Sequence, residues 1–307
     1  MRQRFHALPG HRQGLLAVLG SAVLWSTGGL LIKAVHLDAL GVTMWRSLFA
    51  AAAIMLLTRT LPPLPWRAGR LQWALAISYA LMLVFFVSAT KLTTAANAIF
   101  LQYTAPLFVL VFGRFLLEER PSSVDLACVA VAFAGMGLFF VGRLETDDLW
   151  GNVCAVTSGI AFAIFLTLLR RPECGPRTRP QAMTLGNLLL VASLLGVNLA
   201  RGEGSAFSPG AADLGGLLFL GVLQIGLAYV LFGFGIARVQ ALEASLVGML
   251  EPVLNPAWVF IFLGERPGWW AVAGGTVIVA AVAVRTVVAE RRRPAVAPEL
   301  AVLHSEA

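Results

Sequence analysis

The chain alternates long apolar stretches with short polar or proline-containing breaks, a pattern that predicts membrane-spanning helices. A spanning helix needs about 20 mostly apolar residues. Ten stretches meet or approach this requirement: residues 14–35, 41–58, 72–90, 94–116, 122–141, 149–170, 181–200, 213–236, 241–263 and 268–289. The breaks hold residues that stop a helix, such as Pro62, Pro63 and Pro172. The pattern therefore predicts an all-α membrane protein with ten transmembrane helices.

The composition points to lipid as the solvent of this chain. Of its 307 residues, 58% are hydrophobic and 13% are charged, and the mean hydropathy is +0.81. Soluble domains carry about a quarter charged residues. The formal net charge of +7 comes from basic residues scattered over short connecting segments. We interpret these residues as a signal for membrane topology, and we expect no nucleic-acid partner.

The basic residues also predict the orientation. Seventeen of the 23 lysines and arginines fall in segments on the same side as the N-terminus, five fall on the other side, and Arg46 lies within a span. Basic loops stay in the cytoplasm, so we expect a multi-pass protein of the cytoplasmic (inner) membrane with both termini inside. The first stretch is too long for the apolar part of a signal peptide, so we expect it to be a retained helix.

The chain contains an internal repeat. Pro106 and the run 119–121 (Glu-Arg-Pro) recur 146 residues later as Pro252 and 265–267. The first and sixth spans align at an offset of 137 through Gly14 and Gly151, Ser21 and Ser158, and Leu31 and Leu168. Each half holds five spans, an odd number, so the second half must insert inverted. We expect one repeat at 13–141, the second at 149–289, and a disordered cytoplasmic tail at 290–307.

An inverted repeat in the membrane has a functional implication. Many secondary transporters are built this way, with the substrate site near the middle of the bilayer between the repeats. The alternative interpretation is a duplication that serves stability alone.

The motifs carry a resemblance to a known family. They read AVLWSTGGL at 22–30, TMWRSLFAA at 43–51, TAANAIFLQYTAPLFVLVFGRFLLEERPS at 94–122 and EASLVGMLEPVLNPAWVFIFLGERPG at 243–268. The chain resembles the drug/metabolite transporter superfamily, in particular its EamA-type ten-helix members, over residues 13 to 288. The resemblance implies a carrier with a central cavity lined mainly by spans 1, 3, 4, 6, 8 and 9. Members move amino acids, amines, nucleotide sugars, cofactors or drugs, often outward.

Two charged residues within the spans are the sharpest candidates for a substrate site. Arg46 lies a few residues inside the second span, where a charge costs about 2.5–3.5 kcal/mol on insertion scales. It either snorkels to headgroups and ties helix ends together, or lines the cavity mouth and pairs with a carboxylate. Glu251 lies near the centre of the ninth span beside Pro252. It is either a structural carboxyl or a site for a substrate amine or a proton.

Other polar and aromatic residues fall inside the apolar spans. The residues expected to line a translocation path with Arg46 and Glu251 are Trp25, Tyr79, Gln102, Tyr103, Gln224, Tyr229 and Asn255. Their alternative role is interhelical hydrogen bonding, which contributes about 0.6 kcal/mol on average in membranes. Glu243 begins the ninth span, where a carboxylate favours the helix N-terminus, so we expect it to cap that helix.

These features favour a secondary transporter that moves small metabolites or amino acids by alternating access, with export the favoured direction. A flippase or transporter for lipid-linked or nucleotide sugars is the alternative within this architecture. A membrane-embedded enzyme would need a catalytic constellation, and the four histidines lie outside the predicted spans. We therefore expect no enzyme, no cofactor and no metal. The expected partners are a small-molecule substrate, the lipid bilayer and, as a hypothesis, protons as coupling ion.

Overall fold

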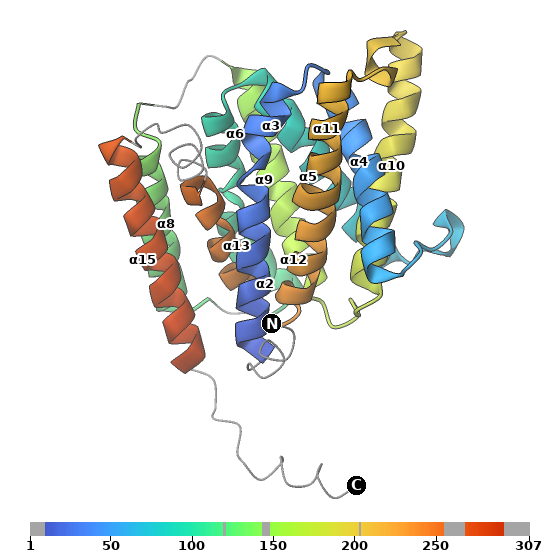
Figure 1. The fold of residues 1–307 in the computed structure, drawn as a ribbon. Coiled ribbons are helices and arrows are strands. Elements are labelled where there is room, and N and C mark those ends of the chain that lie inside the picture. The colour runs from blue at the N-terminus through green and yellow to red at the C-terminus, as the bar shows by residue number, and fades with distance from the viewer. Residues whose placement is uncertain (1–9, 119–120, 143–147, 203, 255–267, 292–307) are drawn as a thin grey trace, which may run out of the picture.

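Every regular element that the structure describes is a helix, and the helices stand side by side in one bundle (Figure 1). This computed structural model describes residues 10–118, 121–142, 148–202, 204–254 and 268–291. The α-helices are α2 (Gly10–Trp25), α3 (Gly28–Ala34), α4 (Ala39–Thr58), α5 (Arg70–Leu92), α6 (Ala95–Gln102), α7 (Ala105–Leu116), α8 (Ser123–Phe139), α9 (Leu149–Leu169), α10 (Thr178–Arg201), α11 (Ala211–Phe219), α12 (Ala228–Ile236), α13 (Ala241–Gly248) and α15 (Trp269–Arg291). A π-helix, η3 (Leu220–Leu227), joins α11 to α12, and short 3-10 turns occur at η1 (Pro65–Arg67) and η2 (Gly204–Phe207).

The expected spans are found as helices. Seven helices or continuous helix runs are long and apolar enough to cross a membrane: Ala39–Thr58, Arg70–Leu92, Ala95–Leu116, Leu149–Leu169, Thr178–Arg201, Ala211–Ile236 and Trp269–Val288. The shorter apolar helix α8 is the fifth span. Helices α2 and α3 together make the first span, and α13 with helical residues 250–254 makes the described part of the ninth. The remainder of the ninth span lies outside the described residues.

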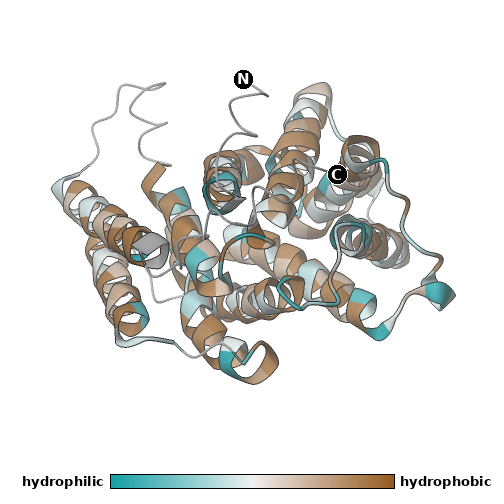
Figure 2. Ribbon diagram, turned by 90° about the horizontal axis from the view of Figure 1, so that it is seen from below, coloured by the Kyte–Doolittle hydropathy of each residue, from teal (hydrophilic) through white to brown (hydrophobic). Residues whose placement is uncertain are grey.

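The outer surface of the bundle is apolar. Leu56 and Phe115 are 79% and 75% exposed, which suits a lipid environment. Figure 2 shows the helices largely brown, with teal residues concentrated at helix ends and connections. Trp66, Trp150 and Trp269 are exposed near span ends, as expected for an interfacial belt.

Two spans break at matching points of the repeat. The fourth span is interrupted between α6 and α7 at Tyr103 and Thr104, and the ninth is interrupted at Met249, 146 residues after Tyr103. Pro106 stands in the first turn of α7, and Pro252 has the same place after Met249. Proline lacks the N–H that a helix interior requires and fits the first turn of a new helix. The paired prolines therefore account for both breaks.

The packing of the helices follows the inverted repeat. The contact of α5 with α9 has its counterpart in α12 with α2, and the contact of α10 with α5 has its counterpart in η3 with α4. Helices α4 and α10 occupy equivalent positions in the two repeats and contact each other. The same holds for α8 and α15. Two tightly packed groups result: the α5 group (α5, α6, α7, α9 and α10) and the α12 group (α2, α4, η3, α12 and α13). Each group contains helices from both repeats.

A pair of serines shows the same relation at atomic detail. Ser21 of α2 donates to the carbonyl oxygen of Ala228 at 2.9 Å, and Ser158 of α9 donates to that of Met82 at 2.8 Å. Ser158 follows Ser21 by 137 residues and Ala228 follows Met82 by 146, the two offsets of the repeat. Both serines are fully buried. Each bond therefore joins the two halves, and the repeat relates one bond to the other.

Glycines allow the closest helix crossings. A Cβ at Gly274 of α15 would lie 2.4 Å from the carbonyl oxygen of Gly135 in α8. A Cβ at Gly235 of α12 would lie 2.7 Å from the carbonyl oxygen of Gly14 in α2. No side chain larger than hydrogen fits at these points, so small residues fix the helix spacing. The start of α2 and the end of α15 lie at the same end of the bundle (Figure 1).

Candidate substrate site in the centre of the bundle

A cavity of about 30 Å³ lies between the α5 group and the α12 group. Its lining includes many of the residues that the sequence predicts for the translocation path. The lining residues are Trp25, Arg46, Met82, Leu83, Phe86, Gln102, Tyr103, Phe162, Gln224, Ile225, Tyr229 and Glu251. Tyr79 is not among them, and Asn255 lies outside the described residues. The cavity is small, with room for little more than ordered water.

Arg46 is buried in the protein, with 1% of its surface exposed. Its Nε and Nη1 atoms have no hydrogen-bond partner among the described residues. A side chain this deeply buried does not reach the lipid headgroups, as the snorkelling alternative would require. Helix η3 approaches α4 closely at this point because Gly221 has no side chain. A Cβ atom at Gly221 would lie only 2.7 Å from the Arg46 carbonyl oxygen. Burying a cation without a partner is costly, so this guanidinium is a candidate to bind an anionic group.

Glu251 is held by one hydrogen bond. The hydroxyl of Tyr103 donates to Glu251 Oε2 at 2.6 Å, and both residues are buried. Tyr103 lies at the break between α6 and α7, and Glu251 follows the matching break at Met249. The interrupted helices thus bring a polar group from each repeat into one cavity, and the bond links the α5 group to the α12 group.

Two glutamines add amide groups to the cavity wall. Gln102 Nε2 donates to Ser158 Oγ at 2.8 Å, so this amide is anchored to α9. Gln224 of η3 packs against Gly28, where a built Cβ would come 2.5 Å from Gln224 Nε2. The Gln224 Oε1 atom has no partner among the described residues, and the same holds for Trp25 Nε1. These atoms remain available as one acceptor and one donor.

Aromatic rings enclose one side of the cavity. The Trp25 ring lies 4.9 Å from that of Tyr229 and 5.1 Å from that of Phe232, measured between centroids. Tyr79 stands behind this wall, with its ring edge-on to Tyr229 at 4.9 Å. Its hydroxyl accepts a bond from Asn187 Nδ2 at 3.2 Å. Tyr79 thus supports the wall without lining the cavity.

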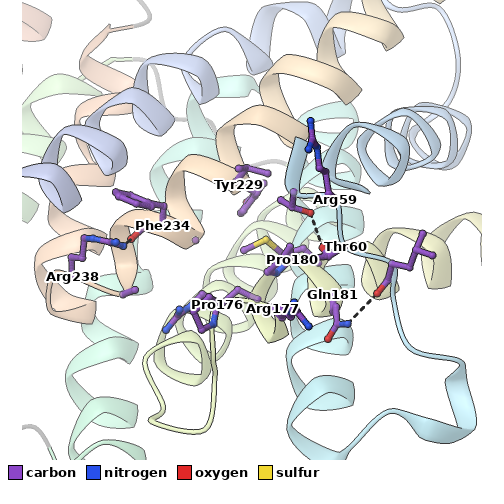
Figure 3. A pocket seen from close by; sticks show the side chains of 16 residues that line it. Arg59, Thr60, Pro176, Arg177, Pro180, Gln181, Tyr229, Phe234 and Arg238 are labelled. Atoms are coloured by element: carbon purple, nitrogen blue, oxygen red, sulfur yellow. Dashed lines mark hydrogen bonds between the residues drawn. The ribbon is translucent and has the colours of Figure 1, made fainter. Parts of the chain in front are cut away.

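A second, larger cavity lies on the other side of Tyr229. Its volume is about 1090 Å³, and its lining residues are Thr58, Arg59, Thr60, Leu61, Pro176, Arg177, Arg179, Pro180, Gln181, Met183, Tyr229, Val230, Gly233, Phe234, Ala237 and Arg238. Figure 3 shows Tyr229 deeper in the bundle than Pro176 and Arg177, with Phe234 and Arg238 on the α12 side. Tyr229 belongs to the walls of both cavities.

The structure reveals buried side-chain pairs that the sequence did not indicate. His11 Nε2 lies 3.0 Å from Glu243 Oε2, and both side chains are buried. His11 lies outside the predicted span 14–35, but α2 begins at Gly10 and includes it as a buried residue. Glu243 lies in the first turn of α13, and its carboxylate bonds His11. No sequence signal links two residues 232 positions apart.

A second network lies at the same end of the bundle. Arg285 of α15 pairs with Asp125 of α8 and also donates to Gln240, just before α13. Asp125 additionally caps α8 by accepting from the backbone N–H of Ser122 at 2.7 Å. Within the described ranges, no group of three histidine, cysteine or acidic side chains is arranged to hold a metal ion.

The fold and the cavity define a class of protein: a multi-pass membrane carrier built from two inverted helical repeats. The sequence matches the EamA-like transporter family over residues 12–141 and 149–287, so the chain belongs to that family. The match covers both halves of the chain.

Relatives agree with this membership. An uncharacterized transporter of Archaeoglobus fulgidus is 27% identical over 280 residues, which cover 89% of this chain and 96% of the relative. A protein of Streptantibioticus cattleyicolor named "Probable terminal-alkyne amino-acid exporter" is 28% identical over 192 residues, 61% of this chain and 63% of the relative. A solved crystal structure shares the fold at 20% identity, with a TM-score of 0.78, and covers 92% of this chain and 100% of that one.

Proposed function

We propose that the protein is a secondary transporter that exports amino acids or similar small metabolites across the cytoplasmic membrane by alternating access. The observation that carries the proposal is the presence of Arg46 and Glu251 in one cavity. A guanidinium with no hydrogen-bond partner on two nitrogens among the described residues matches a substrate carboxylate, and a buried carboxyl matches a substrate amine or a coupling proton. The exporter name of one relative agrees with this substrate class.

The packing suggests which parts move. The two sequence repeats are interwoven, because the α5 group and the α12 group each combine helices of both. Rocking one repeat against the other would break the most extensive helix contacts. The α5 group rocking against the α12 group would preserve the contacts within each group, and the contact of α4 with α10 between the groups would be the pivot. This motion would open the central cavity, which is too small for an amino acid as it stands.

The orientation is part of the proposal. The described chain ends share one end of the bundle (Figure 1), and the larger cavity with its four arginines lies where the basic connecting segments gather. Basic segments are retained in the cytoplasm. This end would therefore face the cytoplasm, and an exported substrate would enter there.

The test is transport by purified protein in liposomes, measured as counterflow of radiolabelled amino acids. Arg46→Gln and Glu251→Gln should each reduce the rate at least tenfold while expression and folding persist. Arg67→Gln removes an exposed arginine that lines neither cavity and should transport like wild type. Undiminished counterflow in both central variants would return Arg46 and Glu251 to structural roles. Accumulation that survives collapse of the proton gradient would exclude protons as coupling ion.

A further inference from the structure

The larger cavity has a one-sided charge. Its arginines come from three separate places: Arg59 at the end of α4, Arg177 and Arg179 at the start of α10, and Arg238 after α12. The described residues that line the cavity include no aspartate or glutamate. Glu173, close in sequence to the α10 arginines, pairs with Arg171 at 3.1 Å. The described part of the wall therefore concentrates positive charge, and Arg59, Arg177 and Arg179 form no ion pair within it.

Two of these guanidinium groups are held by the protein. The Arg238 guanidinium carbon lies 3.5 Å from the centroid of the Phe234 ring, and Nη1 donates to the Phe234 carbonyl oxygen at 2.8 Å. Arg179 Nε donates to the Leu169 carbonyl oxygen at 3.3 Å. A guanidinium carries five N–H donors and favours two-pronged bonds to carboxylate and phosphate. The walls thus present cations that are already positioned.

The cavity leads toward the central site. Tyr229 separates the two spaces, and its hydroxyl lies 3.6 Å from Met82 Sδ while its ring packs on Trp25 and Tyr79. Behind it stands Arg46, with two nitrogen atoms that lack partners among the described residues. A basic cleft with low-dielectric walls attracts anions and raises their local concentration. Positive charge thus extends from the arginines of the larger cavity to the buried Arg46.

We propose that the larger cavity is an anion-binding site that takes the carboxylate or phosphate group of a ligand. For transported ligands the inference rests on the proposed function: the acidic group is bound first by the cavity arginines and then passes Tyr229 to reach Arg46. Retention of basic loops during membrane insertion accounts for arginines at this face in general. This retention does not account for the position of four arginines around one large cavity. Arg67, in the turn before α5, and Arg70, at the start of α5, are exposed arginines that do not line the cavity.

The experiment compares two variants that lose the same charge. Arg177→Gln/Arg179→Gln removes cavity arginines, and Arg67→Gln/Arg70→Gln is the matched control. Binding is measured by thermal stabilisation of detergent-purified protein with succinate, inorganic phosphate and the neutral succinamide. We expect wild type and control to bind succinate or phosphate but not succinamide, with affinity falling as salt rises. The cavity variant should lose at least tenfold in affinity. Arg59→Gln, at an exposed position, should weaken binding in the same direction if the double variant folds poorly.

Lipid headgroups carry the same chemistry, and nanodiscs of two compositions separate the sources. If a soluble anion is the ligand, succinate should bind equally in phosphatidylcholine with and without phosphatidylglycerol. If a lipid headgroup is the ligand, phosphatidylglycerol should displace succinate from wild type and stabilise the cavity variant less. Equal binding by the cavity and control variants, or equal binding of succinate and succinamide, overturns the anion site.

The outcome is independent of the transport test. Counterflow that depends on Arg46, together with unaltered anion binding in the cavity variant, leaves the carrier function and removes this site. Loss of anion binding in a protein that shows no amino-acid counterflow leaves the site and removes the carrier function.

Discussion

Tyr103 and Glu251, 148 residues apart in the chain, are joined by a 2.6 Å hydrogen bond that connects the two helix groups across the central cavity. Each lies beside a break in its span, and the breaks correspond in the repeat. If the α5 group separates from the α12 group during transport, this bond has to open. It would therefore stabilise the arrangement in which the two groups are in contact.

Replacing Tyr103 by phenylalanine removes the donor while preserving the ring. An intramolecular hydrogen bond contributes about 0.5–1.5 kcal/mol, so Tyr103→Phe should shift the protein toward open forms. A cysteine at Gln102, in a background with serine at the three native cysteines, should react with maleimide several-fold faster. Tyr79→Phe is the control, because the bond of Tyr79 to Asn187 joins α5 and α10 within one group. Equal labelling in both variants would mean that the Tyr103 bond does not hold the groups together.

The spans and their breaks could be predicted because both depend on local chemistry. Hydrophobic length locates a span wherever it packs, and the missing N–H of Pro106 and Pro252 interrupts a helix in any surroundings. The internal offset of 146 then relates the two breaks. The motif match between the halves also indicated Ser21 and Ser158 as equivalent, although not what they bond.

The contacts of the site could not be predicted in this way. Whether Arg46 faces lipid or protein depends on the rotation of α4, which is set by the approach of η3 at Gly221. The π-helical turns of η3 change the register of the helix, and no residue pattern in the sequence predicted this change. The pairing of His11 with Glu243 depends on where α2 and α13 begin relative to one another. The burial of a side chain and its hydrogen-bond partners depend on packing between distant segments, so they could not be predicted from a single sequence.

The two equivalent serines should differ in their contribution to stability. Ser21→Ala loses its interhelical bond to Ala228. Ser158→Ala loses the bond to Met82 and also leaves the Gln102 amide without its acceptor. With about 0.6 kcal/mol for an average interhelical bond, Ser158→Ala should cost about twice as much as Ser21→Ala. Reversible unfolding in mixed micelles measures both, and a larger cost at Ser21 would contradict this account.

The crossing of α8 with α15 should tolerate a methyl group at one glycine but not at its neighbour. A Cβ at Gly135 would meet Gly274 O at 3.0 Å and Val277 Cγ1 at 2.9 Å, whereas nothing lies within 4 Å of one at Gly137. Gly135→Ala should therefore destabilise the protein by about 1–3 kcal/mol, the usual cost of overpacking. Gly137→Ala should be neutral or slightly stabilising, because alanine favours helix. Thermal unfolding of the two variants in one detergent decides between these outcomes.

The His11–Glu243 pair should matter far more than a similar pair at the surface. Both partners are buried, so His11→Ala leaves the Glu243 carboxyl group without its hydrogen-bond partner, at a cost of about 1–3 kcal/mol. The imidazole of His36 is 88% exposed and lies 3.1 Å from Asp213. His36→Ala should cost less than about 1 kcal/mol. Similar unfolding free energies for the two variants would show that the buried pair contributes no more than an exposed one.

Cys174 provides a chemical test of the loop between α9 and α10. Burial raises the pKa of its thiol to about 11, and only the thiolate reacts with maleimide. At pH 7 about one thiol in 10,000 is ionised, roughly 300-fold fewer than for an unperturbed cysteine of pKa about 8.5. The pKa is raised, so the reaction should be very slow at pH 7 and accelerate about tenfold per pH unit up to pH 10. Mass spectrometry of a variant with serine at Cys128 and Cys154 measures this rate. The control is a cysteine at the exposed position Arg67, in a background with serine at all three native cysteines. Its reaction should be fast at pH 7, and the rate should level off above pH 9. A Cys174 profile of that shape would show that the loop is open to solvent.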